Sequence, residues 1–149
     1  MKGYLKMPEK TAEVIELIDG YRWYRTGDKG HLDEDGFLTI VDRYSRFAKI
    51  GGEMISLTTV EEEILDACTD KDLEIAATCL PDERKGEKIV LLATNNLDKD
   101  QLKKLLSDAK VNPLYHPAQV LVVEEIPKLG SGKTDFGATK KIALVNEQK

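Results

Sequence analysis

Three apolar runs in the second half of the chain have the length and composition of buried β-strands. Residues 73–80 form a nearly unbroken apolar run with β-branched side chains, and residues 88–94 and 119–124 repeat the pattern. Strands covered on both faces show continuous apolar runs rather than alternation. We therefore expect a small three-stranded sheet with helices packed on it.

Two segments between these runs have helical spacing and begin with residues that can cap a helix. The first opens at residues 56–59, where Thr58 or Thr59 precedes a glutamate by three positions, the spacing of a capping box. The second is capped by Asp98, with Gln101 three residues later. Their apolar faces consist of Leu57, Val60, Ile64 and Leu65 in the first helix, and Leu102, Leu105 and Leu106 in the second.

A third helix is expected near the end of the chain. Thr134 or Asp135 can cap it, and it runs over residues 136–145, although Gly137 weakens it. The resulting order of strand, strand, helix, strand and helix predicts an α+β fold in which helices pack on the sheet.

A glycine pair predicts a β-hairpin ahead of the first helix. Residues 47–50 and 54–55 read as its strands, and Gly51 and Gly52 close the turn. Adjacent glycines in a strand-like stretch also suggest that something else, a chain segment or a ligand, approaches the backbone closely.

Residues 1–42 read as strands and turns with one short helical piece. Pro8 can occupy the first turn of a helix, and residues 21–24 read as a strand. A hairpin over residues 30–41 follows, with Gly36 in its turn. This is too little chain to bury a core, so we expect these residues to be the least ordered unless they dock elsewhere.

Composition and charge narrow the class of protein. The chain has 149 residues, of which 41% are hydrophobic and 33% charged, and a formal net charge of −5, which argues against nucleic acid as the main partner. No apolar run approaches the ~18 residues of a membrane span, and the start lacks the layout of a signal peptide. Cys68 and Cys79 lack the spacing of a zinc site or disulfide framework, which favours buried thiols in the cytosol.

The charges are unevenly distributed along the chain. Residues 43–56 carry three positive side chains and one negative, whereas residues 57–72 carry six negative side chains and one positive. One interpretation is two solvated faces of a charged surface. The other is a basic strip that receives an anionic ligand or an acidic partner. This basic strip would consist of Arg43, Arg46, Lys49, Lys128, Lys133, Lys140 and Lys141.

The segment Ile126-Pro-Lys-Leu-Gly-Ser-Gly-Lys133-Thr-Asp135 places one lysine on a loop of two glycines and a serine. Lys133 supplies a point charge on a flexible stem, suited to neutralising a phosphate or carboxylate during a reaction. A phosphate-binding P-loop would need glycine where this chain has Pro127. For the loop taken alone, an ordinary solvated turn is the simpler interpretation.

Six motifs that occur in a fixed order favour a functional role for this loop over a solvated turn. They are Tyr24-Arg-Thr-Gly-Asp28, Asp35-Gly-Phe-Leu38, Asp42-Arg43, Lys49-Ile-Gly-Gly-Glu-Met-Ile55, Pro81-Asp82 with Gly86-Glu87, and Ile126-Pro127 with Gly132-Lys133. Their order resembles the C-terminal part of the AMP-forming acyl-adenylate ligases, which include acyl-CoA synthetases, peptide-synthetase adenylation domains and luciferases. Within this superfamily, residues 46–56 and 129–136 are most similar to the acyl-acyl-carrier-protein synthetase half of bifunctional 2-acylglycerophosphoethanolamine acyltransferases.

The resemblance implies two parts. Residues 1–42 would be the C-terminal remnant of a large adenylating domain, and residues 43–149 would be a mobile lid domain. Asp28 matches a carboxylate that accepts hydrogen bonds from the ribose hydroxyls of ATP, although an aspartate after Thr-Gly is otherwise most often a turn residue. Arg43 matches an arginine that contacts the nucleotide. The family hinge falls on Ser45, where aspartate or lysine is usual.

The resemblance also implies two successive half-reactions. Lys133 matches the lysine that bonds both partners while the acid is joined to AMP and pyrophosphate leaves. The lid then rotates, and Lys49 with the loop of Gly51, Gly52 and Glu53 lines the tunnel for the pantetheine thiol that displaces AMP.

The expected function follows from these implied roles. The chain would be the C-terminal part of an ATP-dependent, AMP-forming fatty acyl-acyl-carrier-protein synthetase of a 2-acylglycerophosphoethanolamine acyltransferase. Alternatives are an acyl-CoA synthetase, with coenzyme A in place of acyl carrier protein, and a non-catalytic module that binds carrier protein. ATP and Mg²⁺ would serve the full-length enzyme, and the segment alone would bind neither tightly, hold no metal site and be inactive. The segment is expected to be cytoplasmic, and its parent to lie at the cytoplasmic face of the inner membrane.

Overall fold

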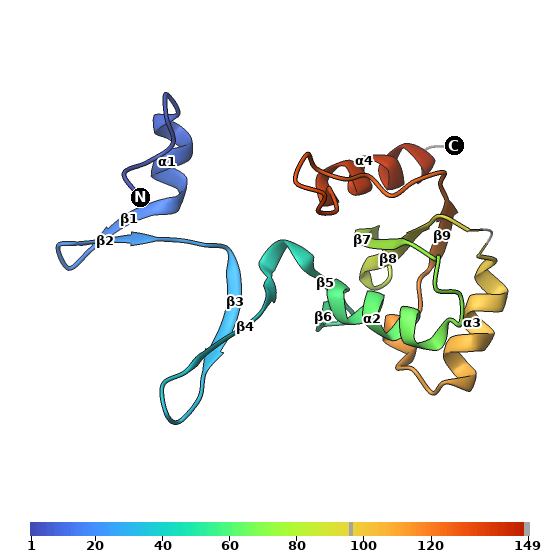
Figure 1. Ribbon diagram of the computed structural model, residues 1–149. Coiled ribbons are helices and arrows are strands. Elements are labelled where there is room, and N and C mark those ends of the chain that lie inside the picture. Colours follow the sequence, from blue (N-terminus) through green and yellow to red (C-terminus); the bar gives the residue numbers. More distant parts are fainter. Residues whose placement is uncertain (96, 148–149) are drawn as a thin grey trace. The chain divides into compact units, whose positions relative to one another are not determined.

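The computed structural model describes residues 1–95 and 97–147, and the chain divides into two units, Met1–Ser45 and Arg46–Lys149 (Figure 1). The boundary suggested by the sequence, after residue 42, falls inside the last strand of the first unit, β4 (Leu38–Arg43). The first unit therefore extends slightly beyond the strip expected to belong to the large domain.

A short helix and two antiparallel hairpins make up the first unit. Helix α1 (Pro8–Val14) has proline in its first turn, as predicted, and runs directly into β1 (Ile15–Ile18). β1 pairs with β2 (Tyr21–Tyr24), and β3 (Asp28–Leu32) pairs with β4, with Gly36 at φ +85° in the turn. The sequence did not predict β1, because no glycine or proline separates it from the helix.

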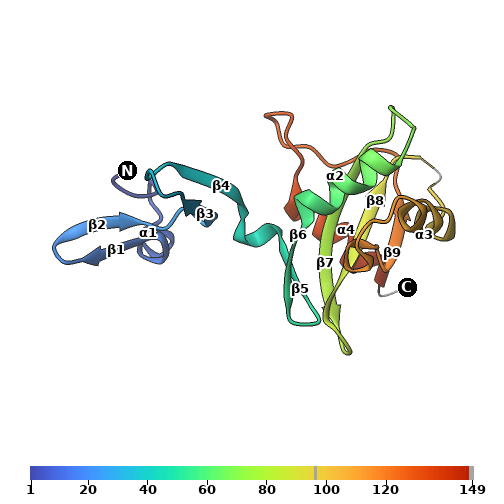
Figure 2. The same cartoon turned by 90° about the horizontal axis from the view of Figure 1, so that it is seen from below.

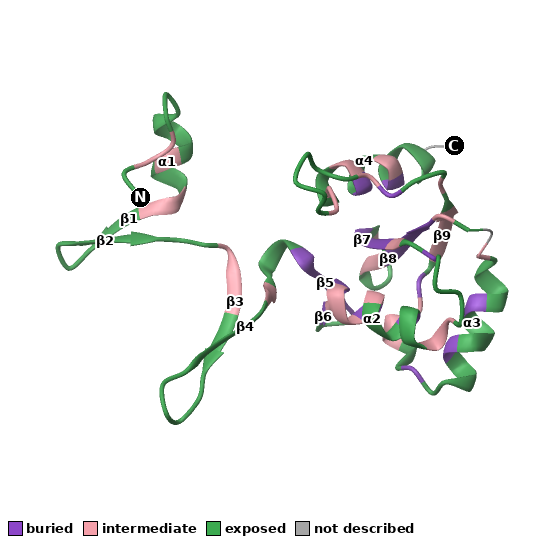
Figure 3. Cartoon of the chain, viewed as in Figure 1, coloured by how far each residue is buried: buried purple, intermediate pink, exposed green. Residues whose placement is uncertain are grey.

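No residue of the first unit is buried (Figure 3). The expectation that this part cannot bury a core of its own is confirmed. Its strands instead expose large apolar side chains, namely Leu17, Ile18, Tyr21, Trp23, Tyr24, Leu32, Leu38, Ile40 and Val41.

Three of the strands in the second unit correspond to the three apolar runs. β7 (Ile75–Asp82) and β8 (Gly86–Ala93) form an antiparallel hairpin that is paired along its whole length. Helix α3 (Lys99–Asp108) and the 3₁₀ turn η2 (Pro113–Tyr115) then lead to β9 (Gln119–Val122), which runs parallel to β8 (Figure 2). A parallel pair needs a crossover of this kind, usually a helix.

The sheet has five strands rather than the predicted three. The expected hairpin is present as β5 (Phe47–Ile50) and β6 (Glu53–Ser56), and it joins the same sheet through the pairing of Ile50 with Gly86. Sequence patterns do not reveal this junction, because it depends on where two hairpins meet in space. The predicted α+β class is confirmed.

The cap of helix α2 (Leu57–Ala67) differs from the prediction. The Ser56 hydroxyl accepts a hydrogen bond from the Thr59 N–H at 3.3 Å, so Ser56 caps the helix and neither predicted threonine does. Ser56 also ends β6, and this tight succession of strand and helix leaves no room for a later cap.

The other two helix starts are as predicted. Asp98 caps α3 by accepting hydrogen bonds from two backbone N–H groups. In α4 (Phe136–Glu147), Asp135 rather than Thr134 is the cap, because Asp135 Oδ1 accepts from the Ala138 N–H at 3.0 Å.

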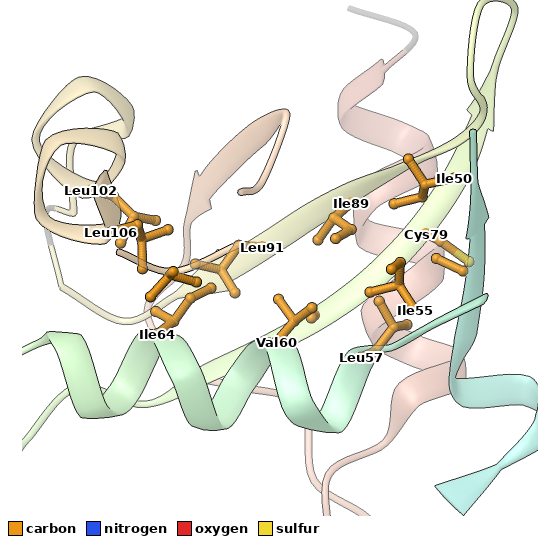
Figure 4. Close-up of a cluster of buried hydrophobic side chains, with 13 residues drawn as sticks. Ile50, Ile55, Leu57, Val60, Ile64, Cys79, Ile89, Leu91, Leu102 and Leu106 are labelled. Atoms are coloured by element: carbon orange, nitrogen blue, oxygen red, sulfur yellow. The ribbon is translucent and has the colours of Figure 1, made fainter. Parts of the chain in front are cut away.

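Both faces of the sheet are covered. Ile89 and Leu91 belong to a cluster with side chains of α2 and α3 (Figure 4), whereas Val90 and Leu92 pack in a second cluster with α4. Successive side chains of a strand point to opposite faces, so two-sided burial requires an unbroken apolar run. This explains the continuous pattern in the sequence.

Candidate functional site

Lys49 lies in β5, one residue before the end of the strand and the turn of the β5–β6 hairpin. Lys49 is exposed while its two neighbours on the strand are buried, because alternate side chains of β5 face opposite sides. The Lys49 N–H donates to the Glu87 carboxylate at 2.5 Å, and the Gly51 N–H donates to the Lys85 carbonyl at 2.9 Å. These two bonds join the hairpin to the β7–β8 turn and to the start of β8.

Gly51 and Gly52 have φ angles of +60° and +93°. A β-carbon on either would meet no atom within 4 Å among the described residues, apart from the adjacent residues of the turn itself. The left-handed turn therefore explains the glycine pair, and the close approach expected from the sequence is not made by any described segment of this chain. Glu53 is exposed beside them, at the start of β6.

Lys133 ends a closed turn. The Leu129 N–H donates to the Lys133 carbonyl at 2.7 Å, and the Gly132 N–H donates to the Leu129 carbonyl at 2.8 Å. Gly132 has φ +81°, whereas Gly130 needs no such conformation. Lys133 is exposed. The lysine thus lies on a hydrogen-bonded turn rather than on an unrestrained glycine loop.

The base of this turn is also held. Lys128 and Thr134 form an antiparallel bridge, and the Asp135 N–H donates to the Pro127 carbonyl at 2.8 Å. The Lys128 ammonium pairs with Glu74, just before β7, at 2.8 Å. The segment that carries Lys133 is therefore attached to the sheet on one side and to α4 on the other.

In the first unit, Asp28 and Arg43 are direct cross-strand partners in β3 and β4. Arg43 Nε lies 3.2 Å from Asp28 Oδ1, and the side chain of Asp28 is 27% exposed against 70% for Arg43. Asp28 and Arg43 were each matched to a residue that contacts the nucleotide in the family. In this structure they form one ion pair, which places a carboxylate acceptor beside a guanidinium donor.

Ser45 is exposed within the 3₁₀ turn η1 (Tyr44–Arg46), between two fixed points. The Tyr44 N–H donates to the Gly27 carbonyl of the first unit at 2.8 Å. Arg46 donates to the Ala77 carbonyl of the second unit, also at 2.8 Å. Ser45, the residue matched to the family hinge, therefore lies between one residue bonded within the first unit and one bonded within the second.

Arg46 was predicted to lie in an exposed basic strip, and this prediction is wrong. This residue is only 4% exposed and pairs with Glu61. Arg43 and Lys128 also have carboxylate partners, Asp28 and Glu74. The exposed lysines of the strip outside these pairs are Lys49, Lys133, Lys140 and Lys141.

Sequence reasoning missed the role of Glu87. Glu87 Oε2 accepts a hydrogen bond from the Lys49 N–H. Glu87 Oε1 accepts one from the Cys79 thiol, whose Sγ lies 3.4 Å away. Burial raises the pKa of the Cys79 thiol, and the nearby Glu87 carboxylate raises this pKa further. Burial also raises the pKa of the Cys68 thiol, and both thiols are free. The Gly86-Glu87 motif marks this residue but does not reveal its contacts, because its partner amide lies 38 residues away.

Comparison with known proteins identifies the family. No family model matches the chain. It is 37% identical over 141 residues to the 2-succinylbenzoate–CoA ligase of Listeria monocytogenes, a match that covers 93% of this chain and 29% of that enzyme. It is 32% identical over 136 residues to the medium-chain fatty-acid–CoA ligase of Escherichia coli, covering 88% and 23%. The chain is a C-terminal segment of the AMP-forming acyl- and aryl-CoA ligase superfamily.

Solved ligase structures agree with this assignment. ATP-bound MatB from Rhodopseudomonas palustris matches this ligase segment with a TM-score of 0.73 and 28% identity, over 95% of this chain and 28% of that one. A fatty acyl CoA synthetase from Mycobacterium tuberculosis matches with a TM-score of 0.60 and 28% identity, over 94% and 27%. The segment thus spans less than a third of the ligases compared.

The ligase segment lacks two kinds of feature within residues 1–95 and 97–147. None of the helices there combines the length and apolarity needed to cross a membrane. In the same residues, no group of three or more His, Cys, Asp or Glu side chains is placed to hold a metal ion.

Proposed function

We propose that residues 43–149 are the mobile lid of an ATP-dependent acid–thiol ligase, and that residues 1–42 complete its large domain. The observation that carries the proposal is that one packed unit holds two exposed lysines, Lys49 and Lys133, each within two residues of a glycine with positive φ. A single rotating unit can present one cation and then the other to the same reacting atoms. The absence of buried residues in the first unit supports the second part of the proposal.

In the first half-reaction, a carboxylate oxygen attacks the α-phosphorus of ATP, and the bond to pyrophosphate breaks to leave acyl-AMP. Two anionic groups meet in this step, so a cation between them is needed most in the transition state. Lys133 would donate to both. Removal of one such donor typically costs ~2.7–4 kcal/mol of transition-state stabilisation, or ~10²–10³ in rate.

In the second half-reaction, a thiolate sulfur attacks the acyl carbonyl carbon, and AMP leaves to give a thioester. Rotation at Ser45 would withdraw Lys133 and bring in Lys49 with the Gly51, Gly52 and Glu53 turn. The open space over both glycines supports this assignment, because a narrow pantetheine arm can pass a backbone that carries no side chains.

The Asp28–Arg43 pair suits a nucleotide. Vicinal ribose hydroxyls can donate to the Asp28 carboxylate, and the exposed Arg43 guanidinium can donate to an oxygen of the same nucleotide. We place Mg²⁺ with the triphosphate of ATP, held by groups outside this chain. The phosphate-binding and acyl-binding residues would also lie outside it, so the chain alone should not turn over.

We favour coenzyme A as the thiol. The relatives named above are CoA ligases, and burial of Arg46 removes one charge from the basic strip that acyl carrier protein would need. The similarity of residues 46–56 and 129–136 to the acyl-carrier-protein synthetases of 2-acylglycerophosphoethanolamine acyltransferases keeps carrier protein as the second candidate. Supplying each thiol to the complete ligase and comparing kcat/KM decides between them.

The test of the proposal uses Lys133→Ala in the complete ligase, with Lys104→Ala, an exposed lysine of α3, as the matched control. Lys133→Ala should lower adenylation, followed by pyrophosphate exchange, by ~10²–10³ and leave thioester formation from supplied acyl-AMP nearly intact. Gly52→Leu should show the opposite selectivity, because it obstructs the turn assigned to the second step. Equal loss of both half-reactions in Lys133→Ala would contradict the division of labour.

A further inference from the structure

A buried guanidinium stands at the first residue of the second unit. Arg46 Nη1 donates to the Ala77 carbonyl at 2.8 Å. Arg46 Nη2 lies 2.5 Å from Glu61 Oε2 and 3.4 Å from the Thr58 hydroxyl, both on α2. A charge this deeply buried is stable only when it is paired and hydrogen-bonded, and these contacts meet that requirement.

The Arg46–Glu61 pair also occupies the free edge of β7. Among the described strands, β7 pairs with β8 alone. On its other edge the Ala77 N–H donates to Glu61 Oε1 at 2.6 Å, while the Ala77 carbonyl accepts from Arg46. The two side chains thus take the place of a neighbouring strand and satisfy both backbone groups of Ala77.

The same guanidinium stacks on an aromatic ring behind the Lys133 turn. The Arg46 Cζ atom lies 3.8 Å from the centroid of the Phe136 ring. Phe136 is the first residue of α4, and Lys133 precedes it by three residues. Phe136 is 41% exposed, so core burial alone does not fix its position.

We infer that Arg46 is a positioning residue for adenylation, which fixes the Lys133 turn to α2 and β7 through the ring of Phe136. This inference rests on the proposed function only for the reaction that the positioning serves. Because Arg46 adjoins Ser45, the lysine would move as part of the rigid lid when the hinge turns. If only its own backbone hydrogen bonds held the Lys133 turn, its orientation relative to the rest of the lid could change during the rotation.

Arginine is needed at this position rather than a generic cation. Its planar fork reaches a carbonyl and a carboxylate at once while one face stacks on a ring, whereas a lysine ammonium is a compact point charge. Arg46→Lys therefore keeps the charge next to Glu61 but loses the stack on Phe136. Phe136→Leu removes only the ring, and Phe136→Tyr retains it.

The first test is amide hydrogen exchange on the 149-residue chain. Phe136→Leu and Arg46→Lys should each speed exchange of the Leu129 and Asp135 amides about tenfold, the order expected for a lost cation–π contact. The Leu91 amide in β8 should be unchanged, and Phe136→Tyr should match the unaltered chain. Arg84→Lys and Phe37→Leu, two exposed positions, serve as matched controls. Unchanged turn amides, or equal acceleration at Leu91, would overturn the inference.

The second test uses the complete ligase. Phe136→Leu should lower pyrophosphate exchange about tenfold and leave thioester formation from supplied acyl-AMP intact, and Phe136→Tyr should restore exchange. Equal loss in both half-reactions, or no rescue by tyrosine, points to a merely structural contact and overturns the positioning role. If Lys133→Ala leaves adenylation intact, the proposed function fails. The amide exchange experiment still tests independently whether Arg46 and Phe136 hold the Lys133 turn in place.

Discussion

The two units of the chain use the same local elements with opposite results. In the first, Tyr21–Tyr24 pairs with Ile15–Ile18 in a regular antiparallel hairpin, yet every residue of β2 is exposed. In the second, β7 and β8 form a hairpin of the same kind, and most of their side chains are buried between helices on both faces. Strand pairing satisfies the backbone, but only a second layer removes apolar side chains from water.

The difference shows that apolar side chains in strands do not by themselves make a core. An isolated two-stranded hairpin is marginally stable in water. The exposed apolar surface of the first unit therefore needs a cover, which we propose is the remainder of a large domain. The second unit has its own two-sided core and no such requirement.

The largest contrast between the units should come from leucine truncation. Leu91→Ala, at a fully buried position, should lower the free energy of unfolding by about 2–5 kcal/mol, because it removes buried methyl groups and leaves a cavity. Leu32→Ala, at a leucine that is 68% exposed in the first unit, should change it by less than about 0.5 kcal/mol. Urea denaturation followed by circular dichroism measures both. A comparable loss in Leu32→Ala would show that the first unit buries this side chain in solution.

Helix capping should give a smaller contrast. Ser56→Ala should cost about 1 kcal/mol, because the Thr59 N–H loses the acceptor at the start of α2. Met7 stands at the corresponding position of α1 and makes no side-chain cap, so Met7→Ala should leave stability unchanged. Thermal unfolding of the two variants decides the point, and Ser56→Thr, which keeps an acceptor, should recover most of the loss.

The smallest effect should be a pH dependence confined to the second unit. Burial raises the pKa of the Cys79 thiol above its ordinary value of 9.0. Below that value both states are protonated and the stabilisation is complete. As pH rises past it, the unfolded thiol ionises while the folded thiol does not, so stability falls until the folded thiol ionises too.

Denaturation at several pH values between neutral and alkaline tests this expectation. The decline should be shallower in Cys79→Ala. The first unit offers an internal comparison, because the pKa of the Tyr24 hydroxyl is raised by its hydrogen bond to Tyr4 although Tyr24 is an exposed residue. An equally steep decline in Cys79→Ala would assign the pH dependence to other groups.

Several elements followed from local chemistry. Asp98 was predicted as a cap because an aspartate ahead of a helical leucine pattern accepts N–H groups that the helix leaves free. The β5–β6 turn was predicted because Gly51 and Gly52 reach positive φ without strain. Lys49 and Lys133 were found from their motifs, and both are exposed, Lys49 in β5 and Lys133 on a turn, although their roles stay predictions.

The errors in the prediction share one cause. Ser56 was passed over as a cap because the capping-box pattern favoured the next two threonines, whereas the end of β6 decided where α2 begins. Arg46 was assigned to an exposed strip because residues 43–56 carry mostly positive charges, whereas its partner Glu61 lies on another element. In both cases a contact with a neighbouring element outweighed the local preference.

The sequence by itself determined the elements whose cause is local: the glycine turns, the aspartate caps and the apolar runs that must be covered on both faces. The tertiary structure alone decided two further features: the junction of the two hairpins into one sheet, and the burial of Arg46 against Ala77, Glu61 and Phe136. The physical reason is the distance along the chain over which each interaction acts. Backbone torsions and capping bonds act within a few residues, whereas burial and ion pairing depend on segments that only folding brings together.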